Sequence, residues 1–159
     1  EGGTVTPGNA SPLNDGAAAV MLMTPEKAKE YGLDPVVKFV GAASVGYDPL
    51  EMGAAPINAV RKLLQKTGVK FDDIGLMEFN EAFAVQALTC IKELGISNRM
   101  ADINVNGGAV ALGHATGCTG ARLTITLMNE MRRRGCKYGL ETLCIGGGQG
   151  IAALYELCE

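Results

Sequence analysis

Hydrophobic residues along this chain fall into two kinds of pattern. Short apolar runs, bounded by glycine, proline or polar residues in the manner of buried strands, occupy residues 36–45, 76–79, 103–105, 140–145 and 151–157. Apolar side chains at helical spacing occur instead in residues 56–68, 81–94 and 121–134. Strands and helices alternate and two strands come last, which predicts a layered α/β domain with a mixed sheet.

The first 35 residues differ from the rest. Residues 17–23 form a short apolar run that predicts a strand, and Thr24 followed by Pro25 begins a short helix. This strand and helix have too few neighbours in their own segment to bury their apolar faces. We therefore divide the chain into a tail at residues 1–35 and a main domain at residues 36–159, and expect the tail to complete a separate domain.

Charge and cysteine content narrow the class of function. The 159 residues carry 14 Lys and Arg against 17 Asp and Glu, a net charge of -3, which argues against a nucleic-acid or membrane-surface partner. Five cysteines without a CxxC pair, and a single histidine, argue against a metal site and for reduced, intracellular thiols. The sequence shows no signal-peptide pattern and no long apolar span, so we expect a cytoplasmic protein with no membrane partner.

Asn80-Glu81-Ala82-Phe83 lies at a predicted junction between a strand and a helix. One interpretation is helix capping, because Asn80 is a good N-cap residue and Glu81 suits the positive first turn of a helix. The other is that Asn80 orients a water or a substrate, because ligands bind at the carboxyl ends of strands in α/β sheets. The motif alone leaves both interpretations open.

The glycine-rich segment at residues 107–120 contains His114, the chain's one histidine. A structural, hydrogen-bonded histidine is one interpretation. The alternative is a base, an acid or a hydrogen-bond donor to a developing oxyanion, because the segment precedes a helix N-terminus that favours negative charge. No Gly-Lys-Ser/Thr follows the glycines, so this is not a phosphate-binding loop of the P-loop type.

Cys144 lies near the end of an apolar run, one residue before three glycines, Gly146 to Gly148. A buried structural thiol is one interpretation. A thiol that meets a substrate is the other, because glycine lets the backbone approach a ligand closely. Taken together, one Asn, one His and one Cys at strand ends or glycine loops fit acyl transfer.

These motifs together resemble the thiolase family. Residues 80–83 resemble its NEAF motif, residues 107–120 its GGxxxLGHPxGxSG motif and residues 144–150 its CxGGGxG motif, while the opening residues 3–11 and 14–17 resemble its GTVTxGNAS and NDGA segments. The resemblance covers essentially the whole chain and corresponds to the C-terminal half of a thiolase. It implies the thiolase-like fold, with a mixed five-stranded sheet between helices on both faces.

The resemblance also implies residue roles. His114 would activate a nucleophilic cysteine and donate to the thioester oxygen, and Cys144 would move the proton at C2 of acetyl-CoA. Asn80 would hold a water in that oxyanion hole, and the Gly146 N–H would serve the acyl-enzyme carbonyl. The implied substrate- and CoA-binding residues are Ser11, Gly8, Phe83 and Met52. Ala115 stands where the family usually has Pro, and Pro7 replaces a small residue.

The implied activity is condensation of two acetyl-CoA to acetoacetyl-CoA and CoA, or the reverse thiolysis, with CoA and acyl-CoA as substrates and no cofactor. The alternatives are a thiolase for longer 3-ketoacyl-CoA and a non-catalytic subunit that binds acyl-CoA. The family's nucleophilic cysteine matches none of Cys90, Cys118, Cys136 and Cys158, and the chain begins Glu-Gly-Gly rather than with Met. We therefore expect a second chain that carries the N-terminal half and this cysteine, in a dimer or tetramer of such pairs.

Overall fold

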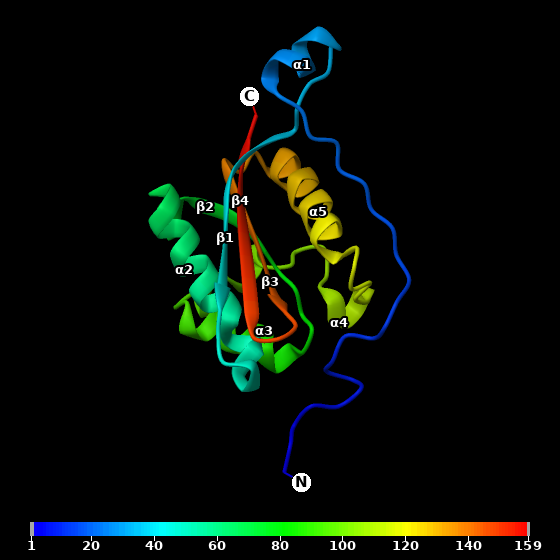
Figure 1. Ribbon diagram of the computed structural model, residues 1–159, viewed down its shortest axis with the longest axis vertical. Helices are drawn as coiled ribbons and strands as arrows, with labels where there is room; N and C mark the ends of the chain where they lie inside the picture. The colour runs from blue at the N-terminus through cyan, green and yellow to red at the C-terminus, as the bar shows by residue number, and fades with distance from the viewer. Residues whose placement is uncertain (1, 159) are drawn as a thin grey trace.

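A mixed sheet forms the centre of the molecule, seen in a computed structural model that describes residues 2–158 (Figure 1). Its four strands lie in the order β1-β4-β3-β2 and are β1 (Val37–Gly46), β4 (Gln149–Leu157), β3 (Tyr138–Ile145) and β2 (Ile74–Phe79). Neighbours β1 and β4, and β4 and β3, are antiparallel, whereas β3 and β2 are parallel. The predicted mixed sheet is therefore confirmed, but it has four strands and not five.

The missing fifth strand was expected at residues 103–105. Ile103 makes a single parallel bridge to Met77 at the edge of β2. The next residue, Asn104, has a φ of 47°, in the left-handed region, and its side chain takes over the pairing. Its Oδ1 accepts from the Phe79 N–H at 2.8 Å, and its Nδ2 donates to the Phe79 carbonyl at 2.9 Å. A side chain thus replaces the strand at this edge.

Helices cover both faces of the sheet, as predicted (Figure 1). On one face lie α2 (Ala55–Thr67) and α3 (Ala84–Glu93), and on the other α5 (Thr119–Arg134). The first face holds the larger core cluster, which includes Leu63, Phe79 and Leu154. The second holds a smaller cluster of Leu76, Leu127 and Met131. Short helices η1 (Pro49–Ala54), η2 (Phe71–Asp73), η3 (Ser97–Asp102) and α4 (Ala109–Leu112) complete the connections. None of the helices in residues 2–158 is long and apolar enough to span a bilayer.

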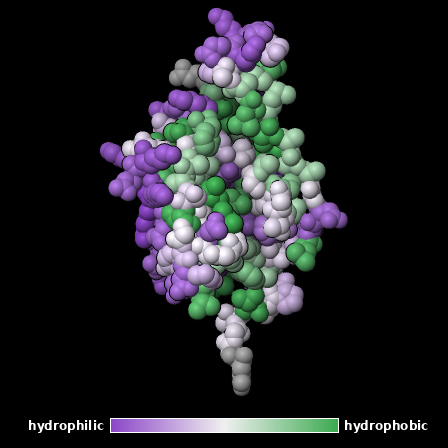
Figure 2. Space-filling view, in the orientation of Figure 1, coloured by the Kyte–Doolittle hydropathy of each residue, from purple (hydrophilic) through white to green (hydrophobic). Residues whose placement is uncertain are grey.

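The tail has one helix, α1 (Pro25–Glu30), capped by Thr24 as predicted. The strand predicted at residues 17–23 pairs with no strand within the described residues, and the segment runs extended along the outside of the molecule (Figure 1). That it completes a sheet of a separate domain therefore stays a prediction. Met21 and Leu22 are each 78% exposed. In Figure 2, hydrophilic residues lie over α1 and α2, and hydrophobic ones lie along the tail and over the middle of the face shown.

Candidate active site

Asn80 stands directly after β2 and is almost fully buried, at 1% exposure. Its backbone N–H donates to the Thr142 carbonyl on β3 at 3.0 Å, which fixes the residue beside the sheet. It does not cap a helix, because α3 begins at Ala84 and its N-cap is Phe83. The capping interpretation is therefore wrong. The Nδ2 atom of Asn80 instead lies 3.4 Å from Nε2 of His114.

His114 lies in the loop between α4 and α5, and contacts from three segments hold it. Its backbone N–H donates to the Pro12 carbonyl in the tail at 3.1 Å, and its Nδ1 lies 2.7 Å from Oγ1 of Thr119. The Thr119 hydroxyl donates its one hydrogen bond to the Ala115 carbonyl at 2.9 Å, so toward the His114 ring it acts as an acceptor. The proton of the neutral imidazole therefore sits on Nδ1, and the lone pair of Nε2 faces Asn80.

The electrostatic surroundings keep this imidazole neutral. Burial and then the Arg122 guanidinium lower the pKa of His114 below its ordinary value. A neutral ring with its lone pair on Nε2 can accept a proton from a nucleophile there. The same nitrogen can then donate a hydrogen bond to a developing oxyanion.

Glu81 does not lie in the first turn of a helix either. Its carboxylate accepts from Asn104 Nδ2 at 2.6 Å and from the Val110 N–H at 3.1 Å. A methyl group at Gly108 would overlap this carboxylate, so glycine is required there. Glu81 thus ties the turn that follows Asn80 to the start of the glycine-rich loop that carries His114.

Cys144 lies near the end of β3 and pairs with Gly150 on β4. In the hairpin loop, a Cβ on Gly148 would overlap the Tyr47 carbonyl, and one on Gly150 would lie 2.6 Å from the Ala55 carbonyl carbon. These two glycines let the hairpin pack against the backbone on either side of η1. Gly146, in contrast, has open space around its Cα. Burial raises the pKa of the Cys144 thiol, so it rests protonated.

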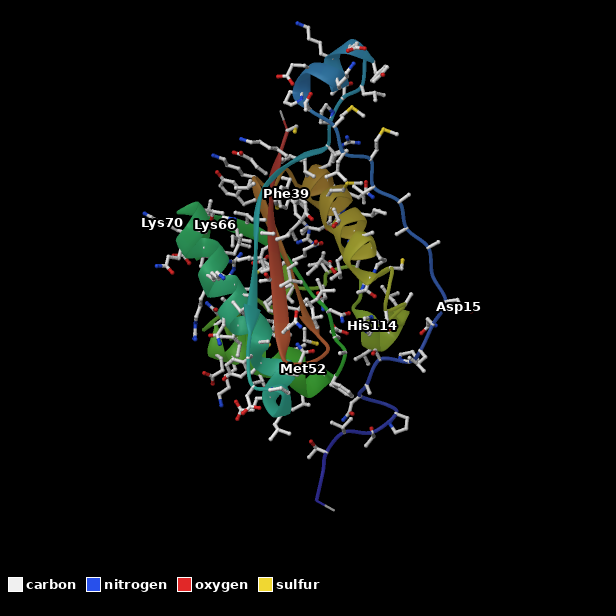
Figure 3. The ribbon with its side chains drawn as sticks, viewed as in Figure 1. Asp15, Phe39, Met52, Lys66, Lys70 and His114 are labelled. Atoms are coloured by element: carbon white, nitrogen blue, oxygen red, sulfur yellow. The ribbon has the colours of Figure 1, made fainter. Side chains whose placement is uncertain are left out.

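A pocket of about 410 Å³ joins these elements. Of the predicted site residues it is lined by Met52, His114, Cys144 and Gly146. Figure 3 shows Met52 and His114 toward the same end of the sheet, on different elements. Asn80 is not part of this lining and contacts the pocket through His114.

The remaining predicted residues lie beside the pocket and do not line it. Ser11 sits against the turn after Asn80, where its N–H and its hydroxyl both reach the Ala82 carbonyl, at 3.0 and 3.1 Å. Phe83 bridges to Ala10 of the tail and is 39% exposed. Gly8 is exposed in a turn of the tail. Part of the tail is thus built into this chain's own site.

Sequence reasoning missed a buried ionic group on the face of the sheet that α5 covers. Glu78 on β2 and Glu141 on β3 are register partners, and burial raises the pKa of each to about 7. Glu141 lines the pocket and accepts hydrogen bonds from the Thr124 and Tyr155 hydroxyls. Arg122 on α5 lies 3.7 Å from Glu78. The sequence did carry a signal for this group, because Glu78 and Glu141 are acidic residues inside otherwise apolar strand patterns.

Among residues 2–158, no three or more His, Cys, Asp or Glu side chains lie close enough together to hold a metal ion. The five cysteines are all free thiols.

Known proteins share the sequence and the fold of this chain. The acetyl-CoA acetyltransferase of Syntrophomonas wolfei and the 3-ketoacyl-CoA thiolase of Bacillus subtilis are each 54% identical over 156 residues, which is 98% of this chain and 39% of either relative. The crystal structure of the Bacillus anthracis acetyl-CoA acetyltransferase superposes with a TM-score of 0.93 at 49% identity, covering 97% of this chain and 39% of that one. The chain therefore spans about two-fifths of the length of these relatives.

Family models match in two pieces. The model described as the thiolase C-terminal domain matches residues 33–157, and the thiolase N-terminal domain model matches residues 1–26. With most of the chain matched and the fold shared, this chain belongs to the thiolase family.

Proposed function

We propose that these residues form part of an acetyl-CoA C-acetyltransferase that condenses two acetyl-CoA to acetoacetyl-CoA and CoA, or runs the reverse thiolysis. The observation that carries the proposal is the neutral His114 imidazole. Its Nε2 lone pair faces Asn80, and the ring lines the same pocket as the thiol of Cys144. His114 supplies a base that becomes a hydrogen-bond donor to an oxyanion once it is protonated, and Cys144 supplies a second acid–base group in the same cavity.

Each group has a role that its surroundings support. His114 takes the proton of the nucleophile and then donates from Nε2 to the thioester oxygen. Asn80 assists through a water, since its buried Oδ1 accepts no hydrogen bond from a described residue. Cys144 holds its proton at rest because its pKa is raised, which suits protonation of C2 in thiolysis. In condensation the same sulfur removes that proton, while the Gly146 N–H serves the acyl-enzyme carbonyl.

The nucleophilic cysteine comes, in this proposal, from outside these residues. Cys144 is the one cysteine that lines the pocket within the described part of the chain. Cys90 is fully buried, its thiol donates to the Gly53 carbonyl, and its pKa is raised to about 11, so it is a poor nucleophile. We propose that the N-terminal thiolase half supplies the nucleophile, from a second chain, in a dimer or tetramer of such pairs.

Substrate contacts complete the proposal. Ser11, Gly8 and Phe83, beside the pocket, contact the CoA moiety, and Met52 in the pocket wall limits the acyl chain. No cofactor is required, because CoA and acyl-CoA are themselves the substrates. Free thiols throughout the chain suit a reducing compartment such as the cytoplasm.

Two alternatives remain, of which the first has specific support. A 3-ketoacyl-CoA thiolase for longer chains is favoured by the name of the Bacillus subtilis relative. A non-catalytic subunit that binds acyl-CoA is the other, although it has no chemical need for both His114 and Cys144.

The test is a thiolysis assay on these residues together with the segment that carries the nucleophile, alongside a native mass measurement. We expect a higher kcat/KM with acetoacetyl-CoA than with 3-ketooctanoyl-CoA. The reverse preference favours the longer-chain thiolase, and saturable acyl-CoA binding without turnover favours the binding subunit. Full activity of the 159-residue chain as a lone monomer would disprove the need for a second segment.

A further inference from the structure

Arg122 and Glu78 form an ion pair that joins α5 to β2 behind the candidate site. The Nη1 of Arg122 lies 3.7 Å from Oε2 of Glu78, whose side chain is 3% exposed. Both Nη atoms of the guanidinium are buried, and neither donates a hydrogen bond to another described residue. The end of this guanidinium is therefore buried, and it interacts with its surroundings mainly through its charge and its packing.

The positions of these two residues relate them to the site. Glu78 is the last residue but one of β2, and Asn80 follows it two residues later, directly after the strand. Alternate residues of an extended chain face the same side of a sheet, so the two side chains lie on one face. Arg122 follows Thr119 by three residues on α5, so it lies about one turn further along the same helix face. Thr119 holds Nδ1 of His114, and Asn80 faces its Nε2. The ion pair thus connects the two elements that hold opposite sides of one imidazole ring.

We propose that Arg122 is a positioning residue, which acts through Glu78 to hold α5 against the end of β2 and so keeps the His114 ring between Thr119 and Asn80. The proposal rests on the proposed function of His114 as the base and oxyanion donor of the same site. It adds a residue that touches neither substrate nor the reacting atoms.

Charge gives this role a measurable consequence. The Arg122 guanidinium lowers the pKa of His114 after burial does, and it also opposes the rise in the pKa values of Glu78 and Glu141. Other charged groups act on the same region: Glu81 and Glu130 both raise the pKa of Glu78. Arg122 is thus the cation among surrounding carboxylates that favours the neutral form of the imidazole.

Replacing Arg122 need not unfold the protein. Removing one partner of a buried ion pair is strongly destabilising where the other partner stays charged. Glu78 already has a pKa of about 7, so without Arg122 it can take up a proton and remain buried as a neutral carboxyl. Arg122→Gln is therefore a usable variant. Arg132→Gln is its matched control, because Arg132 lies exposed at the far end of the same helix.

The experiment measures thiolysis kinetics and an NMR titration of the His114 ring, both in the complete enzyme. The ring signal is assigned by its loss in His114→Asn. For Arg122→Gln we expect kcat to fall about 10- to 100-fold, the scale of a misplaced catalytic group. KM should stay near the parental value, and the pKa of His114 should rise. Arg132→Gln should match the parent in all three quantities.

Two outcomes reject the proposal. An unchanged kcat in folded Arg122→Gln shows that the pair positions nothing. A lower kcat with an unchanged pKa of His114 indicates a general loss of packing. If Arg122→Gln fails to fold, Glu78→Gln takes its place: we expect a lower kcat and a further lowered pKa of His114, and parental values overturn the idea. The titration needs no turnover, so it reports on Arg122 even where the parent enzyme proves not to be a thiolase.

Discussion

The Glu81 carboxylate, packed against Gly108, joins the turn after Asn80 to the glycine-rich loop that carries His114. This contact between Glu81 and the loop can be tested directly. Gly108 has a φ of -103°, which alanine adopts freely, so Gly108→Ala adds a methyl group without backbone strain. That methyl group would overlap the Glu81 carboxylate. The carboxylate must then move away from Asn104 Nδ2 and the Val110 N–H, which it now contacts at 2.6 and 3.1 Å.

The magnitude follows from those two contacts. Hydrogen bonds to charged groups contribute about 1.5–3 kcal/mol each to stability, and Glu81 is half-buried, so water replaces part of the loss. We expect Gly108→Ala to lower the free energy of unfolding by about 2–4 kcal/mol. Thiolysis activity should fall as well, because the glycine-rich loop that carries His114 loses its attachment to the turn after Asn80.

Urea unfolding of a small set of variants checks this reasoning. Gly117→Ala is the matched control in the same loop, because a Cβ there meets no heavy atom within 4 Å, and it should leave stability nearly unchanged. In the double variant Glu81→Ala/Gly108→Ala the methyl group fills space that the carboxylate has left. The double variant should therefore be no less stable than Glu81→Ala alone. Additive losses of unfolding free energy in the double variant, or no loss in Gly108→Ala, would show that Glu81 does not join the two loops in this way.

Three further predictions concern the chemistry. Cys144→Ser should slow condensation about 10²- to 10⁴-fold, the usual contribution of an acid–base group, while acyl-CoA still labels the nucleophilic cysteine at the parental rate. Thr119→Val removes the acceptor for the Nδ1 proton of His114 and should lower the rate of both half-reactions, whereas Thr119→Ser should retain them. The pKa of Glu78 is raised from 4.5 to about 7. The stabilising contribution of Glu78 is therefore complete below about pH 4.5 and is lost as the pH rises through 7. Glu78→Gln should flatten the fall in the free energy of unfolding between these two pH values.

The sequence predicted the main elements because their signals are local. Helix α2 ends at Gly68, which has a φ of 72°, as the pattern of apolar residues and the glycine indicated. Strands β1, β3 and β4 follow from short apolar runs between turn residues. The run at 103–105 has the same appearance, but a side chain, Asn104, makes the pairing there. Hydrophobic pattern cannot distinguish these cases, because both place an apolar segment at a sheet edge.

The sequence named the candidate site residues but could not predict their contacts. Asn80 and Glu81 have the residue types of a helix start, and types alone cannot show whether an amide or a carboxylate bonds locally or across the fold. Here both bond across the fold, to His114 and to the glycine-rich loop. We still predict that the apolar run at residues 17–23 completes a sheet in the N-terminal half, and its exposed side chains suit that role.

The protonation state of His114 is a property of the whole fold rather than of its motif. Pro12 in the tail fixes its backbone, Thr119 on α5 fixes the proton on Nδ1, and Asn80 after β2 faces the lone pair on Nε2. These three residues are far apart in sequence, and each belongs to a different element. A neutral ring with one defined tautomer therefore requires the sheet, the helix and the tail to be assembled together. The loop sequence around His114 supplies the imidazole, and tertiary packing sets the tautomer that the proposed base requires.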